Sequence, residues 1–284
     1  MSDDRPIGLV AVRSEMRPLL ALFQEEGRER LGDATLYIGW IGGRRVALAQ
    51  VLLGPVHAAL GAQALILRHG VGGLISFGSA GALDPALEVG DLVVASRTVA
   101  HDAGAFQGSR FVPLGVKGHD PQGRTGYRRA FEADAGLVDL ALAAAGRPVR
   151  AGTVVSGGQV ILSAARRDWL RQTFGALAVD MESAAVAQAA VAHGLPWVAL
   201  RAISDQAGDE PVDMSRIVIR LDAPRPRWRQ DAGRWLYLFT HPAVRRRLWR
   251  VRQGLVMAAG RAAEWAAAMI AIPAGAEPDG GSLV

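Results

Sequence analysis

The sequence predicts an α/β fold of three layers, in which a mixed, twisted central sheet lies between two layers of helices. Short apolar runs alternate along the chain with segments of helical periodicity, and this alternation is typical of α/β domains. Two β-rich runs, Ala34–Ile41 and Arg44–Leu52, flank Gly42-Gly43 and predict a hairpin, so the sheet is not purely parallel. Half of the 284 residues are hydrophobic, which is enough for one well-buried core.

The first elements follow from local signals. Ile7–Val12 is a continuous apolar run and predicts a buried strand, after which Ser14 can cap a helix. Pro55 suits the first turn of a helix over Val56–Arg68. His101–Tyr127 is polar and rich in Gly, and its weak periodicity predicts a long loop near the ligand or near a partner subunit.

The remaining elements are predicted from the same two periodicities. We expect strands at Gly72–Phe77, Asp91–Val99, Ala151–Ser156, Leu177–Met181 and Trp197–Ile203. We expect helices at Asp134–Ala145, Ser163–Phe174, Ser183–His193, Trp228–Phe239 and Ala243–Ile270.

Composition excludes several classes of function. The chain has no cysteine, so it can form neither a disulfide nor a thiolate metal site, and it has no cysteine nucleophile. Its beginning, MSDDRPIGLVAV, lacks the basic region of a secretory signal, and no segment reads as a membrane span. The six histidines show no HxH or HExxH pattern. We therefore expect a cytoplasmic protein that needs no metal and no cofactor.

Pro224 and Pro226 mark a boundary between two parts of the chain. We expect a catalytic domain over residues 1–223 and a basic helical extension over residues 224–284, which ends in a frayed tail. The extension is rich in arginine and contributes to the formal net charge of +5. No nucleic-acid-binding motif accompanies these arginines, so we expect no nucleic-acid partner.

Helix Ala243–Ile270 of the extension has an apolar stripe, and most of its arginines lie off that stripe. Two interpretations stay open. The helix can pack on the domain and leave a basic face in solvent. Alternatively, it can form an amphipathic surface that rests on anionic lipid, which would place the protein peripherally at the inner membrane face.

Two carboxylates in the stretch Ala178–Gln206 have no evident structural task. Glu182 stands where an apolar run turns into a helix, and Asp205 stands just past the next apolar run. If the two runs are neighbouring parallel strands, both carboxylates emerge at one carboxyl edge, where open α/β sheets bind ligands. The plainer alternatives are a helix N-terminal acid for Glu182 and a turn or cap for Asp205.

Each carboxylate suits a different step in the chemistry of a nucleoside. A carboxylate such as Glu182 can accept two hydrogen bonds from a vicinal diol, as in ribose. A buried acid at Asp205 can donate a proton to a leaving group. Arg201, inside the run before Asp205, either pairs with an acid or lies at a subunit interface.

Two further sequence features are expected at the same carboxyl edge of the sheet. Glu15 follows the first strand and can hold a water molecule for attack at a sugar carbon, or it is an ordinary first-turn helix acid. Gly78-Ser79-Ala80-Gly81 follows a predicted strand, and its small residues let a ligand approach the backbone. A tight turn between a strand and a helix would need the same small residues.

Five segments occur in a fixed order over roughly residues 7–220 and together point to a family: Gly8–Met16, Phe77–Val94, Val154–Ser163, Ala178–Ala187 and Ala199–Ala207. In these segments the chain resembles the nucleoside phosphorylase and nucleosidase superfamily, and most closely its 5′-methylthioadenosine/S-adenosylhomocysteine nucleosidase branch. The resemblance implies a phosphorylase/hydrolase-like mixed sheet, a purine nucleoside as substrate and a homodimer.

The resemblance also implies a role for each candidate residue. Asp205 would protonate N7 of the purine, and Glu15 would position the attacking water. Glu182 would bind the ribose hydroxyls, with Met181 packing on the sugar. The backbone near ribose and base would be that of Ser79, Ala80 and Gly81, and the base-binding segment would be Val160 and Ile161, with the backbone of Ile161 on the purine edge.

The acceptor of the sugar is the next question. Phosphorylases of this superfamily bind phosphate with arginines, one of them just before the Gly-rich turn, whereas Leu74–Phe77 and Leu52–Pro55 contain none. A dianion without a cationic partner is poorly held. We therefore expect hydrolysis that releases adenine from a 5′-substituted adenosine, although Arg13 leaves a phosphate-dependent purine nucleoside phosphorylase open.

Two departures from the branch bear on the substrate. Gly158 and Val160 stand where the branch often has an acid and a Phe, so stacking on the base would be reduced and the pocket enlarged. The basic extension is also unusual for the branch. Both features keep a hopanoid-associated, adenosyl-lipid nucleosidase open as an alternative.

Overall fold

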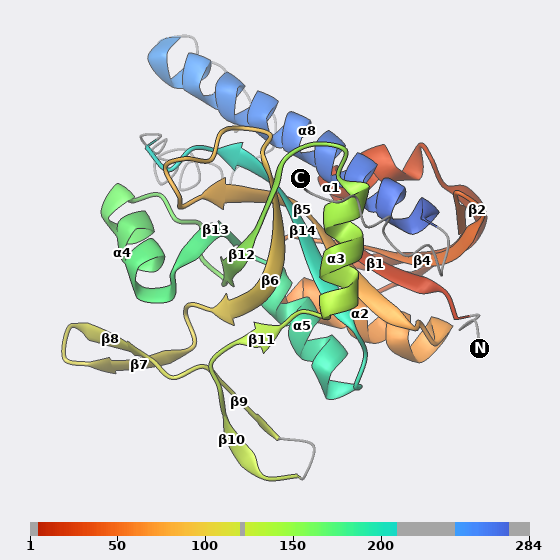
Figure 1. The fold of residues 1–284 in the computed structure, drawn as a ribbon, viewed down its shortest axis with the longest axis horizontal. Helices are drawn as coiled ribbons and strands as arrows, with labels where there is room; N and C mark the ends of the chain where they lie inside the picture. The colour runs from red at the N-terminus through yellow and green to blue at the C-terminus, as the bar shows by residue number, and fades with distance from the viewer. Residues whose placement is uncertain (1–4, 120–122, 209–241, 273–284) are drawn as a thin grey trace, which may run out of the picture.

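The computed structural model describes residues 5–119, 123–208 and 242–272 (Figure 1). The helix predicted over Trp228–Phe239, the predicted boundary at residues 223/224 and the predicted tail all lie outside these residues. The division into a catalytic domain and an extension therefore stays a prediction.

Ten strands form one mixed sheet. They are β1 (Ile7–Val12), β2 (Gln24–Leu31), β3 (Ala34–Ile41), β4 (Arg44–Val51), β5 (Gly73–Ala82), β6 (Leu92–Ala100), β11 (Phe131–Glu132), β12 (Val149–Ser156), β13 (Ala176–Asp180) and β14 (Trp197–Asp205). The described helices are α1 (Arg13–Leu20), α2 (Pro55–His69), α3 (Ala135–Ala144), α4 (Ala164–Phe174), α5 (Ser183–Ala192) and α8 (Pro242–Ala271).

Strand pairing explains the mixed character of the sheet. β1 lies between β4 and β5 and is parallel to both, while the hairpin β3–β4 and strand β2 are antiparallel. On the other side, β5 pairs with β14, β14 with β6, β6 with β12, β12 with β13, and β13 with β5. These five strands therefore close into a ring next to the open part of the sheet.

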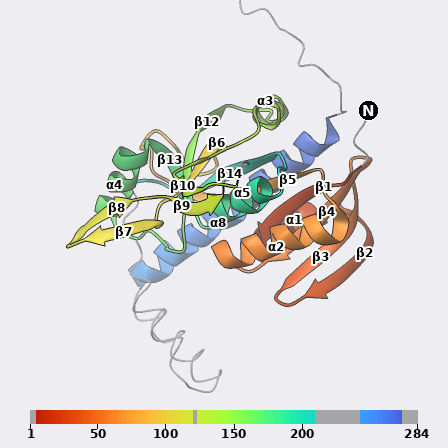
Figure 2. The ribbon, with the colours of Figure 1, turned by 90° about the horizontal axis from the view of Figure 1, so that it is seen from below.

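Helices cover both faces of the sheet, which confirms the predicted three layers (Figure 1). Alternate residues of a strand point to opposite faces. Val10 packs in a cluster with α2 and α5, whereas its neighbour Leu9 packs in a cluster with α1, α3 and α8. Figure 2 shows α8 crossing the fold from one side to the other.

Helix α8 contributes to the core through its second half. Ala258, Ala262 and Met269 are buried in the cluster that also holds β1 and β14. The indole of Trp265 is buried as well, and its Nε1 donates a hydrogen bond to the carbonyl of Ala141 at 2.7 Å. Within the described ranges, no helix is long and apolar enough to span a bilayer.

The sequence prediction placed no strand between α1 and the hairpin, and this was wrong. Gln24–Leu31 forms β2 and pairs with β3. Its sequence, QEEGRERL, shows no alternation of apolar and polar residues. Neither face of the strand is buried: Gly27 is half-buried, and the other seven residues are exposed. A strand that buries neither face leaves no period-two signal.

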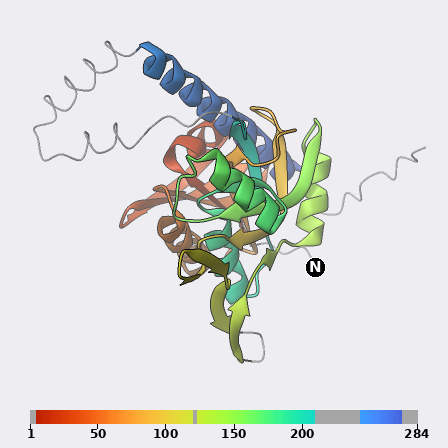
Figure 3. The same cartoon turned by 90° about the vertical axis from the view of Figure 1, so that its left-hand side faces the viewer.

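The prediction of a long loop over His101–Tyr127 was wrong. This stretch forms two antiparallel ribbons, β7 (Gly104–Gln107) with β8 (Arg110–Pro113) and β9 (Val116–His119) with β10 (Thr125–Arg128). Both ribbons project from the sheet (Figures 1 and 3). Phe111 of β8 contacts Trp169 of α4, with ring centroids 6.0 Å apart, and this contact ties the first ribbon to the fold.

Candidate active site

The second half of β5 forms the floor of the candidate site. The sequence predicted a strand that ends at Phe77, before Gly78-Ser79-Ala80-Gly81, but the strand continues through these residues to Ala82. Gly81 pairs with Val179 of β13 on one side and with Asp205 of β14 on the other. The expectation that β13 and β14 are neighbouring parallel strands was therefore wrong: β5 lies between them, and β13 is antiparallel to it. The candidate carboxylates still gather around this stretch of β5.

Glu15 enters the site from the first turn of α1. Its Oε1 accepts hydrogen bonds from both the backbone N–H and the hydroxyl of Ser79. A Cβ atom on Gly78 would overlap Oε2 of Glu15, so the glycine makes room for the carboxylate. Burial raises the pKa of Glu15, and the nearby Arg201 guanidinium opposes this rise only in part.

Glu182 enters from the junction between β13 and α5. The residue is buried, and its Oε1 accepts a hydrogen bond from the backbone N–H of Gly54 at 2.9 Å. Burial, together with the negative charge of Asp180, raises the pKa of Glu182 to about 7. Glu182 can therefore change its protonation state near neutral pH.

A buried ion pair lies beneath these two acids. Nε of Arg201 lies 2.5 Å from Oδ2 of Asp180, and both side chains are almost completely buried. Arg201 also donates hydrogen bonds to the hydroxyls of Ser76 and Ser183. Of the two alternatives for Arg201, the structure favours pairing with an acid. Sequence reasoning did not single out Asp180, although it lies two residues before Glu182 in the same motif.

Asp205 ends β14 and lies beside Gly81, where an added Cβ would come within 3.2 Å of its Oδ2. The sequence suggested a buried acid, but 27 % of the side chain is exposed. Its Oδ1 accepts a hydrogen bond from the Ser204 hydroxyl at 2.7 Å, and its Oδ2 forms an ion pair with Arg167 at 2.5 Å. Sequence reasoning missed Arg167, which comes from α4.

The predicted base-binding segment follows β12. Ile161 is buried, whereas 64 % of Val160 is exposed. Upstream, the Asp102 carboxylate accepts a hydrogen bond from the backbone N–H of Gly158 at 2.7 Å. A Cβ on Gly157 would lie 2.6 Å from Nε2 of the buried His101, so this glycine permits close packing. His101 and Asp102 thus fix the start of the segment.

The structure gives the positions of the other residues expected to contact the ligand, but the contacts themselves stay predictions. Ala80 is buried in β5, while Ser79 and Gly81 are half-buried on the same stretch. Met181 is half-buried just before Glu182. Among the residues that the structure describes, no three His, Asp or Glu side chains gather as a metal site.

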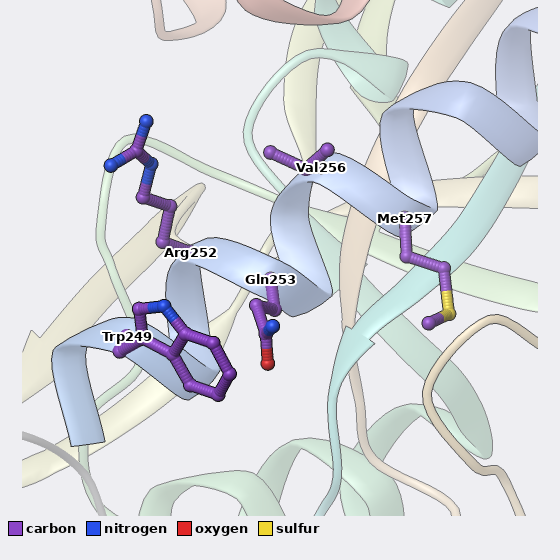
Figure 4. A pocket seen from close by; sticks show the side chains of 5 residues that line it. All are labelled: Trp249, Arg252, Gln253, Val256 and Met257. Atoms are coloured by element: carbon purple, nitrogen blue, oxygen red, sulfur yellow. The ribbon is translucent and has the colours of Figure 1, made fainter. Parts of the chain in front are cut away.

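A separate hollow lies on the exposed half of α8 (Figure 4). It is lined by Trp249, Arg252, Gln253, Val256 and Met257. All five residues come from one helix, and none of the candidate acids contributes to it. We therefore do not assign the nucleoside site to this hollow.

Residues 7–224 match the model of the family described as the phosphorylase superfamily. The chain belongs to the phosphorylase superfamily. This membership confirms the resemblance that the five sequence segments predicted. The superfamily match covers all of the candidate acids and ends before α8.

One curated relative and one solved structure carry the name of the same branch. A 5′-methylthioadenosine/S-adenosylhomocysteine nucleosidase from Mycobacterium bovis is 32 % identical over 231 residues, which are 75 % of this chain and 90 % of the relative. A crystal structure is also similar: that of the nucleosidase of the same name from Neisseria meningitidis in complex with methylthio-immucillin-A. Its TM-score is 0.70 at 26 % identity, and the match covers 94 % of this chain and 99 % of that chain.

A third superfamily member differs in its named substrate. The structure of futalosine hydrolase from Helicobacter pylori also has a TM-score of 0.70 at 26 % identity, and the match covers 94 % of this chain and 97 % of that one. The fold predicted from the sequence is therefore confirmed as that of the superfamily. Two hydrolases with differently named substrates share it to the same degree.

Proposed function

We propose that this protein is a purine nucleosidase that hydrolyses the N-glycosidic bond of a 5′-substituted adenosine and releases adenine. The observation that carries the proposal is the gathering of Glu15, Glu182 and Asp205 around the second half of β5. Named relatives support the same reaction class, because the curated matches are 5′-methylthioadenosine/S-adenosylhomocysteine nucleosidases.

The sugar end of the reaction rests on two carboxylates. Glu182, when ionised, accepts hydrogen bonds from the vicinal ribose hydroxyls. Glu15 holds the attacking water and takes its proton as the water oxygen bonds to C1′; its raised pKa suits a group that must accept a proton. Both negative charges stabilise the positive charge that develops on the sugar.

The base end of the reaction rests on Asp205. When the bond between C1′ and N9 breaks, its electron pair passes to the purine. Asp205 neutralises that charge by giving a proton to N7, which makes adenine the leaving group. General acid assistance of this kind typically contributes about 10²–10⁴ in rate.

Water is the favoured acceptor, because the two buried arginines beside the site already have carboxylate partners. Arg201 pairs with Asp180, and Arg167 pairs with Asp205. Arg13 is exposed two residues before Glu15, and this placement supports a phosphate-dependent phosphorylase as the second candidate.

Adenine release from 5′-methylthioadenosine, measured with and without phosphate, tests the proposal. We expect similar rates in both buffers. Release only in phosphate would overturn hydrolysis and select the phosphorylase. If neither buffer supports release, the 5′-methylthioadenosine assignment is wrong, and futalosine and lipid-linked adenosines are then the substrates to assay.

We further propose that the protein acts as a homodimer. Val56, Leu60 and Leu67 lie at spacings of four and seven residues along α2 and are 62–69 % exposed, so they form an apolar stripe on one helix face. Light scattering should give twice the mass of the chain. Leu60→Asp should give a monomer, while Leu22→Asp, at another exposed leucine, should not. A monomeric wild-type protein would contradict the proposal.

The exposed half of α8 supports a peripheral contact with an anionic membrane. Trp249, Val256 and Met257 are exposed on this helix beside Arg252, a combination that suits a lipid interface (Figure 4). We expect the protein to co-sediment with phosphatidylglycerol vesicles and Trp249→Ala to bind them several-fold less. Equal sedimentation of wild type with neutral and anionic vesicles, or none with either, would contradict this proposal.

A further inference from the structure

The end of β14 carries a bulge immediately before the candidate acid. Ile203 pairs with Ala80 of β5. The next pair along the two strands joins Asp205 to Gly81, so Ser204 has no counterpart on β5. Because side chains alternate between the two faces of a strand, one extra residue turns Asp205 away from the face that Ile203 occupies. The bulge therefore decides to which face the acid points.

Both polar groups of the bulged residue, Ser204, are in contact with neighbouring elements. Its hydroxyl lies 2.7 Å from Oδ1 of Asp205 and 3.2 Å from the carbonyl oxygen of Ala80, so it links the acid to β5. Its carbonyl faces Gly254 of α8, a buried residue on which a Cβ would overlap the carbonyl oxygen. The obstacle is backbone, which cannot rotate aside as a side chain can. A residue larger than glycine would therefore move either α8 or the bulge.

A second contact from α8 secures β14 one residue before the bulge. The backbone N–H of Gly90 donates a hydrogen bond to the carbonyl of Ile203 at 2.7 Å. Nη1 of Arg261, on α8, donates in turn to the carbonyl of Gly90 at 2.5 Å. Helix α8 thus holds the end of β14 directly at Ser204 and through Gly90 at Ile203.

From these contacts we propose that Gly254 is a positioning residue, which seats α8 against the bulge and thereby aims the carboxylate of Asp205 at the leaving base. The inference rests on the proposed function. Arg167 pairs with Oδ2 of the same carboxylate, while the bulge sets the backbone from which the side chain projects. Glycine is unfavourable inside a helix compared with alanine, so the close contact, and not helix formation, explains this residue.

The test is adenine release from 5′-methylthioadenosine by Gly254→Ala. A proton donor must lie within hydrogen-bond reach of the base, and a displacement of about 1 Å can cost about 10²-fold in rate. We therefore expect kcat to fall by roughly 10- to 100-fold, with little change in the Kd of a non-hydrolysable adenosine analogue. Gly260→Ala is the matched control on the same helix, because a Cβ there meets no atom within 4 Å. It should keep the wild-type kcat.

A double-mutant cycle shows whether the effect passes through the acid. In a chain that already carries Asp205→Asn, Gly254→Ala should lower kcat by less than about twofold more, because no proton donor is left to misplace. Losses that multiply in the double variant would overturn the inference. A wild-type kcat in Gly254→Ala, or an equal loss in Gly260→Ala, would overturn it too.

Ser204→Ala provides a second reading if Gly254→Ala does not fold, and thermal unfolding reports folding for every variant. It removes the hydroxyl that links Asp205 to β5 and creates no overlap with α8. We expect kcat to fall by roughly 3- to 10-fold, the loss of about one hydrogen bond, and not to fall further when Asp205→Asn is present. A wild-type kcat in folded Ser204→Ala overturns the inference. Absence of adenine release by wild type would instead overturn the proposed function, so the two failures are distinguishable.

Discussion

The backbone N–H of Gly54 donates a hydrogen bond to Oε1 of Glu182 across 128 positions of the chain. Gly54 precedes α2, and Glu182 precedes α5, so the bond joins the starts of two helices that cover the same face of the sheet. It holds a buried carboxylate in place although the pKa of that carboxylate is raised to about 7. Glu182 is thus fixed in position while its charge varies around neutral pH.

Ligand affinity should follow the charge of Glu182. The ribose hydroxyls donate to the carboxylate, so the ionised form binds the nucleoside more tightly. Because the pKa of Glu182 in the free protein is raised to about 7, affinity should rise with pH up to that value and then level off. Titration calorimetry with a non-hydrolysable adenosine analogue should show Kd falling by up to about tenfold per pH unit below neutrality. Glu182→Gln should bind weakly with little pH dependence, and an equally steep profile in that variant would contradict the role.

Stability should also depend on Glu182. Folding raises the pKa of Glu182 from 4.5 to about 7, so between these values the folded protein binds more protons than the unfolded chain. The free energy of unfolding therefore falls as pH rises through this window, by at most about 3 kcal/mol. Glu182→Gln keeps the acceptor for Gly54 and removes the ionisation. Between pH 5 and pH 8 the Tm of wild type should fall, and the Tm of the variant should fall by roughly 5–10 °C less. Glu132→Gln, at an exposed glutamate, should follow wild type.

A methyl group on Gly78 should disable Glu15. The added Cβ would overlap Oε2 of Glu15 and lie 3.0 Å from Nη1 of Arg201. Gly78→Ala should therefore displace the carboxylate and reduce kcat by about 10²-fold or more, as removal of a catalytic base does. Gly126→Ala is the control, because a Cβ there meets no atom within 4 Å. Wild-type turnover by Gly78→Ala would show that the position of Glu15 does not matter.

Loss of the acid at position 205 should separate binding from turnover. Asp205→Asn keeps the shape of the side chain but cannot protonate N7, so adenine release should fall by at least about 10²-fold. Binding of 5′-methylthioadenosine should persist, as measured by calorimetry. Asp139→Asn on the exposed side of α3 is the control. Unchanged turnover in Asp205→Asn would disprove the assigned role.

The two tryptophans of α8 should differ in their effect on stability. Trp265 is 2 % exposed and its Nε1 donates to Ala141, whereas Trp249 is 60 % exposed. Trp265→Ala should lower the free energy of unfolding by about 3–5 kcal/mol, because it leaves a cavity in the core. Trp249→Ala should change it by less than about 0.5 kcal/mol. Chemical denaturation checks both, and similar midpoints for the two variants would contradict the packing described for α8.

Much of the site could be predicted because its acids follow local signals. Glu15, Glu182 and Asp205 each stand at or near the end of an apolar run, and such runs become buried strands whose ends carry functional groups. Gly42-Gly43 likewise specified the hairpin β3–β4. These predictions required only a few residues of context.

The partners of the acids could not be predicted in the same way. Arg166 and Arg167 are adjacent and chemically identical, and only the orientation of α4 on the sheet decides that Arg167 reaches Asp205. Arg201 lies inside an apolar run, and its pairing with Asp180 depends on how distant strands meet. The antiparallel pairing of β13 with β5 is a tertiary property without a local pattern.

The backing of β14 by α8 determines when the protein can begin to work. The carbonyl of Ser204, next to Asp205, lies against Gly254 of α8, so closely that a Cβ on Gly254 would not fit. The core cluster that holds β14 also includes α8 residues up to Ile270. A nascent chain that has emerged from the ribosome only as far as residue 208 already carries every candidate acid but lacks this support. We therefore expect such a chain to remain inactive until α8 has been synthesised and has docked.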